Sequence, residues 1–343
     1  QTMRRIMHII ALCAALLLNS CDVHELPLPE DPKAEVILHL NFNTEFPFYQ
    51  LVTHPTSRAE SADHYDIRYI VRIYNIDAEL NPDMNSYQEV VVTKDDISEL
   101  NHSFKVNIMP GFYKFMVWTD YVDNGSVSDK YYDTSDFSDI KIMQEYIGNS
   151  NFRDAFIGAH NQLIGLGVSD VVIDLERPLA KYNFISTDLK AFVVKMLALK
   201  AEKQKQNNEE SQQNSELKIN LNDYKVVFRY AGYLPNSFNM FINKPADSWT
   251  GVSFESKITQ INENEAELGF DYVIVNGVES SVTVAVDIYD SVGEKVASCN
   301  PVKVPVKRSK LTTVKSDFLT STAMSGVGVN PEFDGEFNYK VGY

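Results

Sequence analysis

The stretch EVILHLNF, residues 35–42, decides the fold class of this chain. Apolar side chains occupy positions 36, 38, 40 and 42, and three of the four positions 35, 37, 39 and 41 are polar or charged. Successive side chains of a strand point to opposite faces, so this spacing predicts a strand with one buried face.

The same β-type pattern recurs along the chain, and a Pro110-Gly111 turn separates two of the predicted strands. In the segment 302–306, valines alternate with polar residues and Pro305, which has no N–H for a ladder, so we expect an edge strand there. Further strands are predicted at residues 65–75, 88–93, 104–108, 113–118, 170–175, 224–230, 251–261, 266–275, 281–289, 295–306 and 310–317. Many short strands separated by turns are typical of β-sandwiches.

Helical spacing of apolar residues occurs in one place. The segment 188–203 has apolar side chains at positions 189, 192, 193, 196, 197 and 199, with Asp188 at its start, and therefore predicts a helix. A short helix is also expected within residues 151–164. The fold prediction is thus an all-β protein, two tandem β-sandwich domains at residues 35–176 and 177–343, with a short helix in the second.

The N-terminus has the pattern of an export signal. Met3, taken as the start, is followed by Arg4, Arg5 and a largely apolar run that ends in Asn19-Ser20-Cys21. A small residue directly before a cysteine is typical of lipoprotein signals, so residues 1–20 are predicted to be a signal peptide and Cys21 the lipidated residue. Residues 21–34 are acidic and Pro-rich, which indicates an extended tether. A plain signal peptide that happens to contain a cysteine remains the alternative.

The cysteine count is consistent with this assignment. Cys13 lies inside the signal and Cys21 is predicted to be acylated, which leaves Cys299 without a disulfide partner. Cys299 lies in a strand-like stretch without a nearby histidine, so we expect a buried, inert thiol.

Composition and motifs give no sign of chemistry. A formal net charge of −16 argues against nucleic-acid binding, which needs clustered Lys and Arg. Nucleophile elbows, phosphate loops and zinc-type histidine spacings are missing from the sequence. Asp133, Asp136 and Asp139 recur every three residues, but a solvated acidic loop is favoured over a calcium site. We therefore expect no enzyme activity, no cofactor and no metal, although spacing alone does not reveal the paired carboxylates of a glycosidase.

Several short motifs in a fixed order make the chain resemble the fimbrillin superfamily of Bacteroidales, the stalk, tip and anchor lipoproteins of surface pili. They are Cys21 followed by HELP (24–27), PGFY (110–113) running into VWTD (117–120), RPLAK (177–181), VPVKR (304–308) with LTTV (311–314), and FDGE (333–336).

The resemblance implies two transthyretin-like domains, a surface-exposed lipoprotein in the outer membrane, and a pilus subunit in cell adhesion. Its partners would be other pilus subunits, joined by β-strand exchange. In fimbrillins a trypsin-like protease removes the first strand and opens a groove, and Arg58, in the polar loop 53–64, is the candidate processing site here. Arg68 and Arg72 lie nearby and are also potential trypsin sites.

The C-terminus is the candidate donor strand. From Phe337 on, Phe337, Tyr339, Val341 and Tyr343 alternate with polar residues or Gly, and Phe333 precedes them. Such a strand must lay one face on a core, either in its own domain or in the groove of a neighbouring subunit.

A second function is compatible with the sequence: a non-polymerising surface lipoprotein that binds a glycan. Its site would be an aromatic-rich loop with Trp118, Tyr121, Tyr131 and Tyr132. Sugars stack on exposed aromatic rings, so solvent exposure of this cluster separates the two hypotheses.

Overall fold

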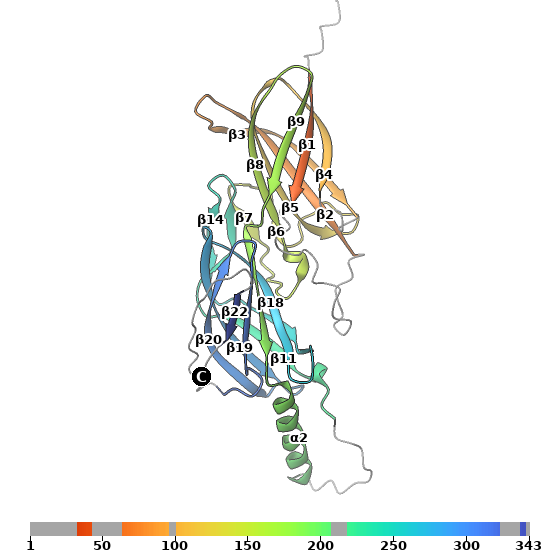
Figure 1. Ribbon diagram of the computed structural model, residues 1–343, viewed down its shortest axis with the longest axis vertical. Helices are drawn as coiled ribbons and strands as arrows, with labels where there is room; N and C mark the ends of the chain where they lie inside the picture. Colours follow the sequence, from red (N-terminus) through yellow and green to blue (C-terminus); the bar gives the residue numbers. More distant parts are fainter. Residues whose placement is uncertain (1–32, 43–63, 96–100, 207–217, 323–336, 341–343) are drawn as a thin grey trace, which may run out of the picture.

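The computed structural model describes residues 33–42, 64–95, 101–206, 218–322 and, for the backbone, 337–340. Two β-rich lobes lie end to end along one long axis, with the α-helix of the described residues at the far end of the second lobe (Figure 1). The tandem β-sandwich fold predicted from the sequence is confirmed, because each lobe is built from two sheets.

The first lobe packs a three-stranded sheet, order β4-β1-β9, against a four-stranded sheet, order β3-β2-β5-β8. In the smaller sheet, β1 is antiparallel to β4 and parallel to β9. The strands are β1 (Ala34–Phe42), β2 (Tyr65–Ile76), β3 (Pro82–Lys94), β4 (His102–Ile108), β5 (Gly111–Asp123), β8 (Phe156–Ile164) and β9 (Val168–Leu175).

The second lobe has a five-stranded sheet, order β17-β18-β10-β21-β22, and a four-stranded sheet, order β16-β11-β19-β20. Strand β20, which contains Pro305, is the last strand of its sheet, so the predicted edge position is confirmed. The strands are β10 (Leu179–Ser186), β11 (Lys225–Tyr230), β16 (Ser253–Lys257), β17 (Thr259–Gln260), β18 (Ala266–Ile274), β19 (Glu279–Tyr289), β20 (Lys295–Lys307), β21 (Leu311–Ser316) and β22 (Phe337–Lys340).

A small sheet, order β14-β13-β7-β6, joins the lobes, because β7 comes from the first half of the sequence and β13 from the second. Phe238 of β13 is fully buried and belongs to the core of the first lobe. A domain boundary at residues 176/177 therefore stays a prediction. The first hydrophobic core contains residues from both sides of this position. The bounds are β6 (Tyr132–Asp133), β7 (Ile140–Ile142), β13 (Ser237–Asn239) and β14 (Lys244–Pro245), beside a two-stranded pair of β12 (Leu234–Pro235) and β15 (Ser248–Trp249).

The predicted helix at 188–203 is confirmed as α2 (Leu189–Gln206), which buries Leu189, Phe192 and Met196 against the second core. The helix expected within 151–164 is wrong. Only the single 3-10 turn η2 (Asn151–Arg153) forms there, because residues 156–164 pair with residues 111–119 of β5. A second 3-10 turn, η3, spans Leu221–Asp223. Within the described residues, no helix has the length and apolarity needed to cross a membrane.

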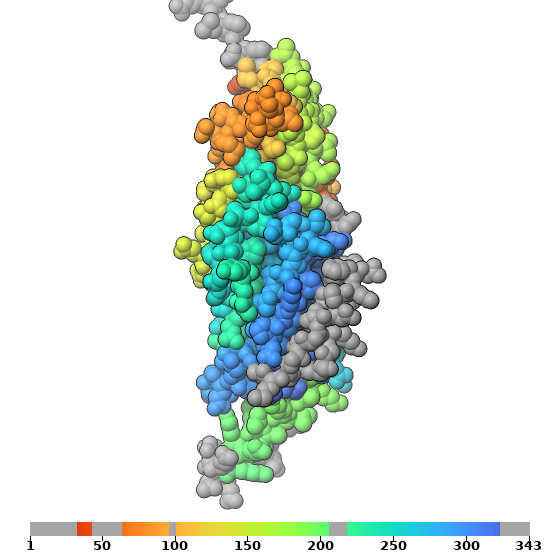
Figure 2. All heavy atoms as spheres, turned by 90° about the vertical axis from the view of Figure 1, so that its left-hand side faces the viewer, coloured from red at the N-terminus to blue at the C-terminus, as the bar shows by residue number. Residues whose placement is uncertain are grey.

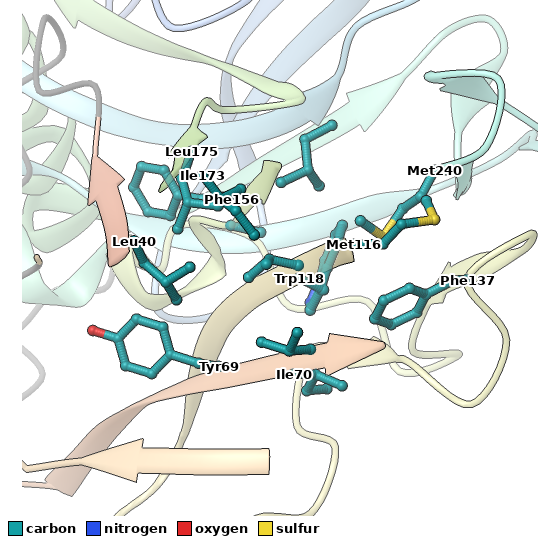
Figure 3. Close-up of a cluster of buried hydrophobic side chains, with 14 of the residues drawn as sticks. Leu40, Tyr69, Ile70, Met116, Trp118, Phe137, Phe156, Ile173, Leu175 and Met240 are labelled. Carbon is teal, nitrogen blue, oxygen red and sulfur yellow. The ribbon is translucent and has the colours of Figure 1, made fainter. Parts of the chain in front are cut away.

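The first core is continuous from β1 to the second lobe. Figure 3 shows Leu40 of β1, Tyr69 of β2 and Phe156 of β8 in one cluster that extends to Met240, a residue of the second lobe. Close packing leaves little room between the sheets: a Cβ added at Gly158 would lie 2.6 Å from the side chains of Ile173 and Leu175. This core positions β1, the strand that the resemblance singles out.

Candidate functional site

Strand β1 lies at the centre of the three-stranded sheet, and every second side chain enters the core. Burial of one aliphatic side chain stabilises a fold by about 1.5–3 kcal/mol. The stripe of inward side chains on β1 therefore makes a large contribution to the free energy that keeps the strand in the sheet. Phe42 at its end packs edge-to-face on Phe156, with ring centroids 4.8 Å apart. The exposed fractions along the stripe are 0% for Ala34, Val36 and Leu38, 1% for Leu40 and 9% for Phe42.

The opposite face of β1 carries polar pairs with both neighbouring strands. The His39 ring lies 2.9 Å from Ser103 Oγ on β4 and 3.0 Å from Asp170 Oδ1 on β9. Glu35 forms an ion pair with Lys105 at 2.9 Å. Because these side chains are largely exposed, each pair contributes less than about 1 kcal/mol. These polar pairs therefore contribute to the register of β1 and add little to its stability.

Strands β4 and β9 do not pair with each other, since β1 lies between them. The ladder with β4 runs from Ala34–Ile108 to Leu40–His102, and the ladder with β9 runs from Glu35–Val168 to Phe42–Leu175. Departure of β1 would therefore expose an apolar slot flanked by two unpaired strand edges. A strand that filled this slot would gain two ladders and a set of side-chain pockets.

The predicted lipidation site, Cys21, and the predicted processing site, Arg58, lie outside the described residues. Arg58 falls between the last described residue of β1, Phe42, and the start of β2. The two neighbouring arginines are not accessible to a protease. Arg68 is 2% exposed and forms a buried ion pair with Asp120 at 2.7 Å, while Arg72 is 6% exposed.

At the C-terminus, the backbone of β22 pairs in parallel with β21, from Phe337–Thr312 to Lys340–Lys315. This places Phe337 and Tyr339 at the edge of the five-stranded sheet of their own chain, with one neighbouring strand only. Phe333, Val341 and Tyr343 lie outside the described residues. Donation of this strand to another subunit remains a prediction.

The aromatic cluster proposed for glycan binding is part of the core. Trp118, Tyr121, Tyr131 and Tyr132 are between 1% and 4% exposed. Trp118 contacts Tyr132 edge-to-face and donates its Nε1–H to Asp120, and the Tyr132 hydroxyl donates to the carbonyl of Arg153 at 2.5 Å. The alternative of an exposed aromatic platform therefore fails its own test: Trp118 and Tyr121 lie in β5, and all four rings belong to the core of the first lobe.

The junction between the lobes contains a buried polar cluster that the sequence did not reveal. Asp271 of β18 accepts hydrogen bonds from Arg153 of η2, from the Tyr146 hydroxyl at 2.5 Å and from the Tyr230 hydroxyl at 2.6 Å. Burial raises the pKa of the Asp271 carboxyl, and the Arg153 guanidinium and the two hydroxyls oppose that shift. The cluster joins side chains more than a hundred residues apart.

A second buried pair lies beside it. Arg177, in the RPLAK motif, donates Nε–H to Asp154 at 2.8 Å, and both side chains are at most 3% exposed. The neighbouring Lys181 donates to Asn151 Oδ1 at 2.6 Å and lies 4.0 Å from the Phe270 ring centroid. Burial lowers the pKa of Lys181 to about 8. The motif therefore serves to join the two lobes.

The residues weighed above as a nucleophile or as metal ligands are buried in a strand or bonded within loop turns. Cys299 is buried in β20, and burial raises the pKa of its thiol to about 11, as expected for an inert cysteine. Asp133 and Asp136 accept hydrogen bonds from Ser135 and Ser138, two residues further on, as in ordinary loop turns. The part of the chain that the structure describes holds no group of three or more metal-type ligands.

The chain belongs to family DUF6562, a family of unknown function, whose model matches residues 32–342. A comparison with curated proteins finds no match. Among solved structures, the chain is similar to proteins from Bacteroides thetaiotaomicron described as candidate polysaccharide-binding proteins. That match has 12% identity, covers 78% of this chain and 80% of that chain, and has a TM-score of 0.43.

Two similar structures come from Porphyromonas gingivalis. The fimbrial anchor protein Mfa2 matches with 9% identity over 78% of this chain and 82% of that chain, at a TM-score of 0.36. The tip fimbrial protein Mfa3, with a C-terminal truncation, matches with 10% identity over 80% of this chain and 81% of that chain, at a TM-score of 0.37.

Proposed function

We propose that the chain is a surface-exposed, fimbrillin-like lipoprotein that takes part in a pilus or in adhesion by β-strand exchange. The observation that carries the proposal is the position of β1. It is a central strand near the N-terminus whose removal leaves an apolar slot between two strands that, among the described residues, have no other partner in their sheet.

The sequence supports the same proposal from a second direction. The ordered motifs from Cys21 to FDGE (333–336) resemble fimbrillins, and the C-terminal residues have the alternation that a donated strand needs. In this scheme a protease cuts after Arg58, β1 leaves, and a donor strand from a neighbouring subunit fills the slot. A subunit that keeps Cys21 and β1 would stay at the base of the fibre.

Deletion of residues 333–343 tests the donor half of the scheme. The truncated chain should remain a folded monomer of nearly unchanged thermal stability, because β22 has a single neighbouring strand, but it should not enter filaments. Immunogold labelling of surface filaments in a strain that carries only the truncated chain reads out incorporation. Unfolding or aggregation of the truncated protein would show that the strand belongs to its own lobe.

Substitutions on the two faces of the strand provide a matched control. Phe337→Ser with Tyr339→Ser removes the apolar face and should abolish incorporation, whereas Asn338→Ser with Lys340→Ser changes the polar face and should preserve it. Equal incorporation of both variants would contradict donation. N-terminal sequencing of the filament form distinguishes a processed subunit, which starts at Ala59, from a basal one, which starts at Cys21.

The alternative, a lipoprotein that binds glycan through Trp118, Tyr121, Tyr131 and Tyr132, has lost its supporting observation, since these rings are buried. We do not propose it.

A further inference from the structure

Two turns in the first lobe, with the strand ends beside them, consist of apolar residues and glycine or proline alone. The segment across the β8–β9 turn reads LIGLGV (163–168), and the segment across the β4–β5 turn reads MPGF (109–112). No polar or charged side chain occurs in these ten residues, yet four of their large side chains are exposed. The exposed fractions are 72% for Leu163 and Leu166, 64% for Val168 and 40% for Met109.

The two connections lie together at one end of the molecule. Ile164 pairs with Gly111, and Leu163 pairs with Phe112, across β8 and β5. A Cβ added at Gly165 or Gly167 would meet nothing within 4 Å, so the connection projects into open space. We call residues 109–112 and 163–168 the apolar end.

The apolar end is also where β1 begins. The Glu35 N–H donates to the Gly167 carbonyl at 3.0 Å, and Ala34 pairs with Ile108. Figure 1 shows the β8–β9 connection at one extremity of the long axis and α2 at the other. The space-filling view in Figure 2 gives the same arrangement, with the light-green segment at one extremity and the green helix at the other.

The opposite end of the molecule is charged. Helix α2 carries five lysines, and Lys203 pairs with Glu294 of the β19–β20 turn at 2.7 Å. Val292 in that turn is 76% exposed but stands among polar neighbours. The two ends therefore differ in the surface that each can contact.

We propose that the apolar end rests in the surface of the membrane beside the lipid anchor. Lys33 lies only twelve positions after Cys21, which limits the reach of the tether to roughly 40 Å. An apolar surface held that close to a bilayer is buried at the acyl–headgroup boundary without desolvating a charge, because its connections have none. The inference rests on the proposed function, from which it takes the acylation of Cys21.

This contact would orient the whole protein. The first lobe would meet the membrane and the second lobe would point away from it, with α2 as the most distant element. A subunit that keeps β1 would then be fixed at two points, the acyl chains and the apolar end. Burial of apolar surface at the interface adds to the binding that the acyl chains provide, so the second contact strengthens attachment.

A site-specific fluorescent label tests the contact in the full acylated chain. Leu166→Cys and, as a control of matched exposure, Val292→Cys are each labelled with the environment-sensitive dye NBD. Cys299 is buried and does not compete for the dye. In vesicles of phosphatidylethanolamine and phosphatidylglycerol that contain a nitroxide phospholipid, we expect the label at position 166 to lose at least half of its emission. The label at position 292 should lose almost none, and equal quenching, or none at either position, would overturn the inference.

A second measurement removes the lipid anchor and leaves only the apolar end. In a Cys21→Ser chain, Leu163→Glu with Leu166→Glu should lower co-sedimentation with the same vesicles at least fivefold, while Val278→Glu with Val292→Glu leaves it unchanged. Equal sedimentation with and without the substitutions at 163 and 166 would contradict the inference. Dimerisation through these residues without vesicle binding would contradict it too, by assigning the surface to a second copy.

The outcomes separate the two proposals. Quenching at position 166 in a chain that never enters filaments would overturn the proposed function alone. Incorporation into filaments without quenching would overturn the membrane contact alone.

Discussion

Strand β1 and the junction between the lobes are both buried, but they are held in opposite ways. The inward side chains of β1 are all apolar, and its polar pairs, such as His39 with Asp170, lie at the surface. The junction instead buries ions: Arg153 and Asp271 are each 1% exposed, and Arg177 and Asp154 are at most 3% exposed.

In the proposed scheme, the first of these contacts is exchanged and the second is kept. An apolar slot accepts any strand with a suitable alternation of side chains, since no specific partner atom is required. A buried ion pair tolerates no such exchange, because removal of one partner leaves an uncompensated charge in the core. In the proposed scheme, the two lobes therefore stay together while the first strand is replaced.

Loss of one partner at the junction should have the largest effect on stability. Arg153→Ala leaves the Asp271 carboxyl buried without its cation and should lower the free energy of unfolding by about 3–5 kcal/mol. Guanidinium chloride unfolding, followed by circular dichroism, gives this value.

The paired variant is the control for this prediction. Arg153→Met with Asp271→Asn leaves no charge buried and should recover part of the loss. A single variant as stable as the wild type would show that the junction does not depend on the ion pair.

A truncation in the stripe of β1 should have a smaller effect. Leu38 is fully buried, so Leu38→Ala should lower the free energy of unfolding by about 3 kcal/mol through lost burial and a cavity. Ile37, on the other face of the same strand, is the control, and Ile37→Ala should cost about 1 kcal/mol or less. If the two substitutions have equal effects, the apolar stripe does not hold the strand.

The smallest expected effect is a pH dependence at Lys181. Its folded-state pKa of about 8 lies below the ordinary value of 10.5, so between these values the unfolded chain binds more protons than the folded one. Stability attributable to Lys181 should therefore rise with pH across that window. We expect the difference in free energy of unfolding between wild type and Lys181→Met to shift in favour of the wild type from pH 7 to pH 9.5. An unchanged difference would contradict the assigned burial.

Much of the fold could be predicted from the sequence, because its signals are local. Alternation in residues 35–42 predicted β1, helical spacing predicted α2, and Pro305 predicted the edge position of β20. The prediction failed at residues 156–164, where apolar residues at 156, 157 and 164 have helical spacing but pairing with β5 selects a strand.

The site could be predicted only in part. The stripe of β1 is visible in the sequence, but its central place between β4 and β9 depends on pairings with residues 62 to 133 positions away. The junction was not predictable, because Arg153 and Asp271 are 118 residues apart and no periodic pattern links them. Burial of Tyr131 and Tyr132, which follow β5 in the chain, likewise depends on how that segment packs on the sandwich, which composition does not encode.

In the proposed scheme, β1 leaves its slot during assembly, and a reversible disulfide lock on this strand is the sharpest test of that step. His39 and Ser103 are register partners on β1 and β4, so His39→Cys with Ser103→Cys should form a disulfide that ties the strand in place. Val227→Cys with Glu255→Cys, register partners on β11 and β16, is the matched lock in the second lobe. We predict that the oxidised β1 lock folds normally but does not enter filaments, that reduction restores incorporation, and that the control lock incorporates in both states. Wild-type incorporation of the oxidised β1 lock would contradict the account.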